Sequence, residues 1–227
     1  MLKRGNAIIC FLLGTVTALH AGTITFDNPP AGLTPNYFIQ GSPVGASSQL
    51  TNQFESLGVI FSTFGGAPYA ALIDLTGQAP SGTNGIGALN SSGNVDYTQD
   101  IDIFLVVPGT TTAAVTDFIS IQGDEEPIPG NVIFSAYDIN GNLVASGTQP
   151  DSAGGVYSLS AAGIHEFRLH SDSGTVAYDN LSFDVPAAPS TPSGAPEPGS
   201  LFLFATGTMG ALMLGFGRKL FAGKRAA

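Results

Sequence analysis

Short runs of β-branched and aromatic residues recur along the middle of the chain, and turn-forming residues separate them. In the run 132–138 the apolar side chains Val132, Phe134 and Ala136 share one side, because successive residues of a strand point to opposite faces. No stretch of ten or more residues between 22 and 185 repeats its apolar positions with the helical period of 3.6. The pattern therefore predicts β-strands along the whole of this region.

Ten strands are predicted from such runs, and Asn140-Gly141 between two of them is a strong hairpin turn. The predicted strands are Thr23–Asp27, Val59–Thr63, Ala70–Leu75, Ile101–Val107, Phe118–Gln122, Val132–Asp138, Leu143–Gly147, Gly155–Leu159, His165–His170 and Val176–Val185. Without helical crossovers they predict an all-β fold, an antiparallel β-sandwich of the jelly-roll type. Two proline- or glycine-rich stretches, 29–53 and 78–97, are predicted to be long loops.

The N-terminus has the pattern of a secretory signal peptide. Lys3 and Arg4 precede an uncharged apolar stretch at 7–18, and small residues follow, so residues 1–21 are predicted to be removed. The single cysteine, Cys10, leaves with this segment. The mature chain then needs no disulfide, although export would permit one.

The C-terminus carries three features in a fixed order. An acid-containing proline motif, Pro196-Glu197-Pro198, follows a Pro/Ala/Ser linker at 186–195. An uncharged span at 200–217 comes next, and as a helix it would be about 27 Å long, just enough to cross a bilayer core of about 30 Å. The basic tail that ends the chain contains Arg218, Lys219, Lys224 and Arg225. Its charges predict a cytoplasmic end and an external body.

This arrangement over residues 196–227 resembles the PEP-CTERM sorting signal of exopolysaccharide-producing Gram-negative bacteria. The resemblance implies recognition of Pro196, Glu197 and Pro198 by an exosortase-type enzyme, followed by removal of the span. The alternative is an ordinary C-terminal anchor that is never cut.

Charge is distributed very unevenly along the chain. All seventeen Asp and Glu lie between Asp27 and Glu197, where Arg168 is the only Lys or Arg, so the exported part carries a formal charge near −16. Nucleic acid is excluded as a partner, because phosphates require clustered cations. The acidic groups either keep an exported protein soluble or bind calcium, which prefers oxygen ligands.

Three segments of the predicted sandwich, 51–61, 136–142 and 178–183, are similar to recurrent pieces of PEP-CTERM ectodomains. Those ectodomains resemble galactose-binding-like domains and carbohydrate-binding modules with jelly-roll folds. The resemblance implies association with glycans or matrix and identifies no sugar-binding residue.

A structural calcium site is one interpretation of the acidic pairs near the two ends of the sandwich. Asp27-Asn28 ends the first predicted strand and Asp179-Asn180 lies in the last, and the first and last strands of such folds are commonly neighbours. The alternative is that Asp179 and Asn180 cap a bulge or turn through bonds to the backbone.

The sequence contains no recognisable catalytic motif. His165 and His170, five residues apart on one predicted strand, lie on opposite faces and cannot pair as ligands. Glu55 and the group Asp124-Glu125-Glu126 are the carboxylates to test for glycoside hydrolysis, and the latter group is predicted to be a solvated hairpin tip. The chain is therefore predicted not to be an enzyme.

Together these patterns predict an exported, non-enzymatic binding or structural protein of the cell surface or exopolysaccharide matrix, with 22–185 as its ectodomain. The implied partners are the Sec translocon, signal peptidase, an exosortase and exopolysaccharide, and no cofactor other than the calcium above. The alternatives are a calcium-stabilised lectin-like module and a secreted polysaccharide hydrolase.

Overall fold

The structure is a computed structural model that describes residues 22–189, except 38, 62, 65–66, 127–128 and 173–175. The predicted signal peptide, the sorting motif, the span at 200–217 and the basic tail lie outside the described residues. Within the described ranges, no helix has the length and apolar content that a membrane crossing requires.

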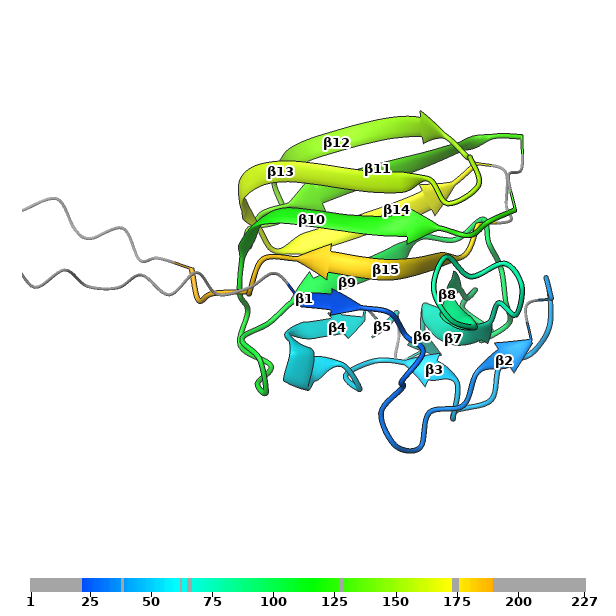
Figure 1. Cartoon of the computed structure of the whole chain (residues 1–227). Helices are drawn as coiled ribbons and strands as arrows, with labels where there is room; N and C mark the ends of the chain where they lie inside the picture. The colour runs from blue at the N-terminus through cyan, green and yellow to red at the C-terminus, as the bar shows by residue number, and fades with distance from the viewer. Residues whose placement is uncertain are drawn as a thin grey trace, which may run out of the picture. The chain divides into compact units, whose positions relative to one another are not determined.

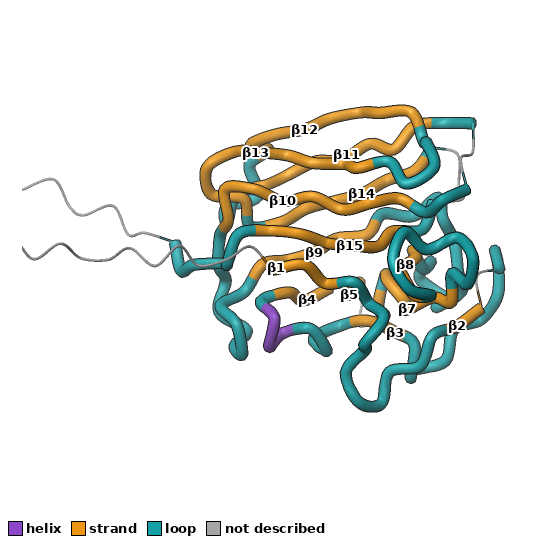
Figure 2. The backbone as a smooth tube through the Cα atoms, viewed as in Figure 1, coloured by secondary structure: helices purple, strands orange, loops and turns teal. Residues whose placement is uncertain are grey.

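The described residues form two facing β-sheets with almost no helix, so the predicted β-sandwich is confirmed (Figures 1 and 2). The larger sheet has the order β13-β10-β15-β8-β7-β2, with β1 beside β15 and β3 beside β7. Its strands are β1 (Gly22–Ile24), β2 (Asn36–Tyr37), β3 (Gln49–Leu50), β7 (Ala70–Asp74), β8 (Asn84–Ala88), β10 (Thr116–Gly123), β13 (Val156–Ile164) and β15 (Tyr178–Phe183). Only the short pair β2–β7 is parallel among the pairings described in this sheet.

The smaller sheet is antiparallel throughout its described pairings and has the order β12-β11-β14-β9-β4. Its strands are β4 (Val59–Phe61), β9 (Ile101–Leu105), β11 (Asn131–Tyr137), β12 (Leu143–Pro150) and β14 (Glu166–Ser171). A two-stranded piece, β5 (Thr63–Phe64) with β6 (Ala67–Pro68), and a 3-10 turn, η1 (Glu55–Leu57), complete the described elements.

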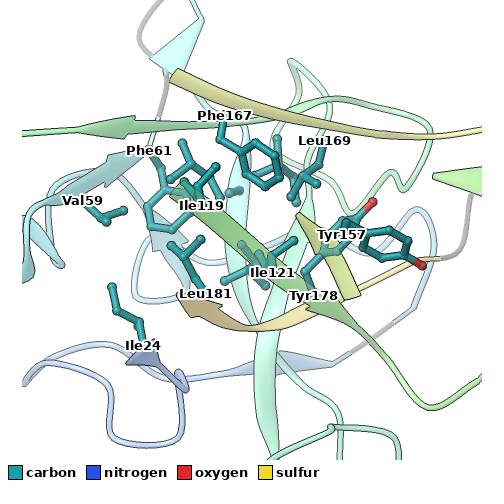
Figure 3. Packing of buried hydrophobic residues seen from close by; sticks show 14 of the residues in the cluster. Ile24, Val59, Phe61, Ile119, Ile121, Tyr157, Phe167, Leu169, Tyr178 and Leu181 are labelled. Atoms are coloured by element: carbon teal, nitrogen blue, oxygen red, sulfur yellow. The ribbon is translucent and has the colours of Figure 1, made fainter. Parts of the chain in front are cut away.

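The core lies between the two sheets, where the inward positions of each strand alternate with outward ones. Figure 3 shows Phe167 and Leu169 of the smaller sheet meeting Ile119, Ile121 and their neighbours from the larger sheet. These side chains are at most 1% exposed, so the residues up to Pro189 form a compact unit with a core of their own. We therefore expect this unit to fold when produced alone.

Strand β8 was predicted to be loop, and this prediction is wrong. All five of its residues are buried, and it lies between β7 and β15. A Cβ at Gly85 would come within 2.5 Å of the Tyr178 carbonyl oxygen, and one at Gly87 would overlap Ile73. Close packing thus requires glycine at these positions. Because glycines stand where apolar side chains would otherwise alternate, the sequence lacks the pattern that indicates a strand.

The first and last strands are neighbours, as the sequence predicts for this type of fold. Gly22 pairs with Phe183 and Ile24 with Leu181 in antiparallel register. Beyond β15 the chain makes one further bridge, in which Ala187 and Val115 exchange backbone hydrogen bonds of 2.8 and 3.0 Å. This bridge lies within the first residues of the segment predicted to be a linker.

Candidate functional site

The outer face of the smaller sheet carries a group of charged side chains on two paired strands. Burial alternates strictly along β9 and β14, so Asp102 faces away from the core on β9, and Glu166, Arg168 and His170 do so on β14. The register places Arg168 directly opposite Asp102.

Arg168 is held in place by carboxylates on both sides. Its Nε donates to Asp102 at 2.6 Å and its Nη2 donates to Glu166 at 2.8 Å, while an oxygen of Asp100 lies 3.8 Å from Nε. The guanidinium also lies 5.1 Å from the centre of the Tyr137 ring, within the range of a cation–π contact. The guanidinium position is therefore fixed from three directions.

A hydrogen-bonded turn brings the loop before β9 to the same place. Asp96 accepts bonds from the Thr98 backbone N–H at 3.2 Å and from the Thr98 hydroxyl at 2.7 Å, an arrangement typical of an Asx turn. The turn leads into Asp100, whose carboxylate lies 2.8 Å from Nδ1 of His170. Asp96 and Asp100 thus position the loop and the end of β14 relative to each other.

These elements enclose a hollow of about 270 Å³ on the outer face of the sheet. We call it the polar hollow; it is lined by Tyr69, Thr98, Gln99, Asp100, Asp102 and Arg168. All of its lining residues carry a hydrogen-bonding side chain, and one of them is aromatic. A small, hydroxyl-rich ligand suits such a surface better than an apolar one does.

The electrostatics of the polar hollow are dominated by its carboxylates. Burial raises the pKa of Glu166, and repulsion by Asp102 adds to this effect against the attraction of Arg168. Burial alone would lower the pKa of Arg168, but its bond to Asp102 and the charges of Asp102 and Glu166 together outweigh burial and raise it. Partial desolvation, with the charges of Asp102 and Asp100, raises the pKa of the Tyr69 hydroxyl. Three acidic side chains, Asp100, Asp102 and Glu166, thus surround one guanidinium.

His165 and His170 do not share a site. His165 lies just before β14; its Nδ1 lies 2.9 Å from the Ala114 carbonyl oxygen and its ring packs against Phe104. His170 contacts Asp100 on the outer face. The prediction that the two histidines do not meet agrees with this placement.

The acidic pairs predicted to hold calcium converge in part. Ser81 connects Asp27 and Asp179: its hydroxyl lies 3.1 Å from Oδ2 of Asp27 and 2.7 Å from Oδ2 of Asp179, and its backbone N–H donates to Asp179 at 2.9 Å. Oδ1 of Asp27 also accepts from the backbone N–H groups of Thr83 and Asn84. The two carboxylates thus bind the segment 81–84.

The other two predicted ligands lie elsewhere. Asn28 is exposed, and the Asn180 amide donates to Gln122 at 3.0 Å. Asn180 has a positive φ of 51° at an irregularity in the β10–β15 register, as the alternative of a capped bulge predicts. No three His, Cys, Asp or Glu side chains come together as metal ligands in the part of the chain that the structure describes.

Calcium fits this group of residues poorly. The ion takes six to eight oxygen ligands, whereas the oxygens of Asp27 and Asp179 already accept bonds from five donors, four of them backbone N–H groups. Burial raises the pKa of Asp179, and the bonds from Ser81 lower it less than burial raises it. Calcium binding here stays a prediction from the sequence.

The acidic loop after β10 differs from the predicted solvated tip. Asp124 is 1% exposed, and its carboxylate accepts from the backbone N–H groups of Ala177 and Glu126. Burial raises its pKa to about 6, against the effect of these two bonds. Only Glu125 and Glu126 are exposed as predicted.

The carboxylates named for hydrolysis do not line the polar hollow. Glu55 begins η1 next to β4, whereas Glu125 follows β10 of the larger sheet. Among the described residues, these candidates thus belong to different elements, and the polar hollow includes none of them.

The comparisons with known proteins leave the chain without a family. No protein-family model matches its sequence, and no curated protein matches it. Among solved structures, a DUF4465 family protein from Bacteroides caccae is 9% identical, with a TM-score of 0.40, over 72% of this chain and 98% of its own. The enzymatically active domain of tailspike protein 4 from bacteriophage CBA120 is 13% identical, with a TM-score of 0.31, over 62% of this chain and 22% of its own.

An arabinose-bound α-L-arabinofuranosidase is 12% identical, with a TM-score of 0.24, over 73% of this chain and 29% of its own. At these identities and TM-scores none of the three likenesses carries an argument about function. The site has to be argued from the residues of this chain.

Proposed function

We propose that the chain is an exported, non-enzymatic glycan-binding module and that the polar hollow is its binding site. One observation carries the proposal: carboxylate, guanidinium, amide, hydroxyl and aromatic groups line one small hollow on a rigid sheet. Sugar hydroxyls both donate and accept hydrogen bonds, so they match acceptors such as Asp100 and donors such as Gln99. The ring of Tyr69 supplies a surface for the apolar face of a sugar.

The charge balance favours a neutral sugar over an acidic one. Arg168 already donates to Asp102 and Glu166, so its charge is largely balanced within the protein. Any additional anion in the hollow would meet the remaining negative charge of Asp100. Uronic acids, sulfated sugars and phosphates are therefore expected to bind more weakly than neutral hexoses.

Calorimetric titration of the unit 22–189 with neutral and uronic-acid oligosaccharides tests this proposal. A neutral oligosaccharide should bind, and Tyr69→Ala should weaken it roughly fivefold, since a stacking contact with an aromatic ring contributes about 1 kcal/mol. Tyr37→Ala is the matched control, because Tyr37 is 75% exposed and lies outside the hollow. The titrated mixtures should also be analysed for cleaved sugar.

Binding that Tyr69→Ala and Tyr37→Ala leave equally strong would place the sugar elsewhere and refute the assignment of the polar hollow. Cleavage of the oligosaccharide by the wild type would refute the non-enzymatic part of the proposal. A panel in which no neutral sugar binds at millimolar concentration would refute the function as a whole.

The route to the cell exterior belongs to the same proposal and rests on the terminal sequences. The segment 1–21 would direct the chain to the Sec translocon and signal peptidase, and 196–227 would direct it to an exosortase-type enzyme. Intact mass and fractionation of the native protein test this. A product that ends near Pro198 outside the inner membrane supports sorting, whereas retention of 200–227 in the inner membrane contradicts it.

A further inference from the structure

Strand β12 is a long edge strand that carries two of the usual protections, Pro150 at one end and a register irregularity near Leu143 at the other, and none between them. It ends the smaller sheet, pairs only with β11 in the described sheets, and none of its eight residues is buried. In an antiparallel edge strand, alternate backbone N–H and C=O groups point away from the sheet. Those of residues 143–150 make no hydrogen bond beyond the sheet to any other described group.

Charge is also missing along this edge. Residues 139–164, which include β12 and β13, contain Asp151 as their only charged residue, and Asp151 is 9% exposed. The rest of the ectodomain holds fifteen further Asp and Glu against Arg168 alone. Natural edge strands are commonly guarded by a lysine, another charge or a bulge, because a bare edge pairs with other strands. A like-charged molecule would therefore meet little repulsion at this edge.

The middle of β12 carries small side chains. Ala145, Ser146, Gly147 and Thr148 are small residues, and a Cβ at Gly147 would come within 2.5 Å of the Phe134 ring. The register with β11 is regular from Asn131↔Pro150 to Ala136↔Ala145, so this part of the edge has no bulge. The regular, small-residue stretch therefore suits close backbone pairing.

From these three features we infer that β12 pairs antiparallel with β12 of a second copy of this chain, across a two-fold axis near Ser146 and Gly147. Each copy brings the same strand to the axis, so the contact is closed and self-complementary. The two smaller sheets then become one continuous sheet of ten strands. The polar hollows lie on the outer face of that sheet, one in each copy, so a dimer would present two binding sites to one polymer.

The size of the contact sets the expected strength. One pair of eight-residue strands covers less than the roughly 1,200–2,000 Å² of a stable interface, so we expect a dissociation constant of roughly 10 μM to 1 mM. Such an interaction becomes important where many copies are concentrated on one surface, since bivalent binding then raises the effective affinity.

Sedimentation equilibrium of the unit 22–189 from about 10 μM to 1 mM tests the inference. The wild type should show a monomer–dimer equilibrium. Ser146→Glu should abolish it, because the two introduced carboxylates would face each other at the axis. Thr111→Glu adds the same charge to an exposed loop outside both sheets and should leave it intact. Thr148→Glu is a second edge variant in case Ser146→Glu unfolds, which far-UV circular dichroism would reveal.

Amide hydrogen exchange locates the contact. Amides of 143–150 should exchange more slowly at high than at low protein concentration in the wild type, and equally at both in Ser146→Glu. A wild type that stays monomeric at 1 mM overturns the inference. Dimerisation that Ser146→Glu and Thr148→Glu both leave unchanged overturns it as well, and neither result bears on sugar binding by the monomer.

Discussion

Asp124 should make the folded protein more stable in mild acid than at neutral pH. Its carboxyl is buried, and burial raises its pKa from 3.8 to about 6. Between these two values the folded state binds a proton that the unfolded state releases, so the free energy of unfolding falls as pH rises. At about 1.4 kcal/mol per pH unit the whole effect is about 3 kcal/mol, of which about 2 kcal/mol falls between pH 7 and pH 4.5.

The variant Asp124→Asn removes this titration while keeping the shape of the side chain. Its single amide oxygen can accept from only one of the N–H groups of Ala177 and Glu126, which costs about 1–3 kcal/mol at every pH. At pH 7 this cost is offset in part, because the variant does not bury a charge. The variant should therefore lose most stability in acid, and its free energy of unfolding should depend less on pH.

Urea unfolding followed by far-UV circular dichroism measures the difference, since the chain contains no tryptophan. Burial also raises the pKa values of Asp179 and Glu166, whose contributions have the same sign but cancel between the two proteins. Hydrogen bonds lower the pKa values of Asp138 and Asp172, whose stabilisation is lost only below about pH 4. The range from pH 7 to 4.5 therefore isolates Asp124.

The matched control is Glu125→Gln, which removes a charge from the exposed neighbouring side chain. It should unfold with the pH dependence of the wild type. Equal pH dependence for the wild type and Asp124→Asn from pH 7 to 4.5 would refute the reasoning, because it would mean that Asp124 is not buried as a charge.

Two other predictions concern the larger sheet and the carboxylates at its margin. Gly85→Ala should lower the free energy of unfolding by about 2 kcal/mol or more, because its Cβ would approach the Tyr178 carbonyl oxygen within 2.5 Å. The control Gly45→Ala, whose Cβ would have nothing nearer than 3.9 Å, should change the free energy of unfolding little. Equal urea midpoints for the two variants would contradict the packing of β8 against β15. The thermal midpoint of the unit 22–189 should be the same in EDTA and in millimolar calcium, because N–H donors already occupy the oxygens of Asp27 and Asp179. A higher thermal midpoint in calcium, lost in the variant Asp27→Asn, would instead support the metal site.

The strands were predictable where burial alternates and obscure where it does not. In β11 the inward Val132, Phe134 and Ala136 alternate with less buried positions, so the sequence contains the period that the structure uses. In β8 every residue is buried, and glycines replace the expected side chains because neighbouring strands fill their space. No local pattern distinguishes such a strand from a glycine-rich loop.

For the candidate site, the sequence predicts only the directions in which the side chains point. Asp102 and Arg168 face outward as their alternation requires, but their contact depends on the pairing of β9 with β14, and they are 66 residues apart. Tyr69 reaches the same hollow from a third part of the chain. The buried Asp124 likewise accepts a hydrogen bond from the backbone N–H of Ala177, 53 residues away, and the sequence near Asp124 does not indicate this contact.

The adjacency of β1 and β15 has a mechanical consequence. Strand β15 lies inside the larger sheet, paired with β10 along one side and with β1 and β8 along the other. A pull on the chain after Phe183 would act along the strand, so the hydrogen bonds on both flanks would bear load together in shear instead of opening one at a time. A protein tethered through its C-terminal end would thus have a strand that resists load in shear close to the tether.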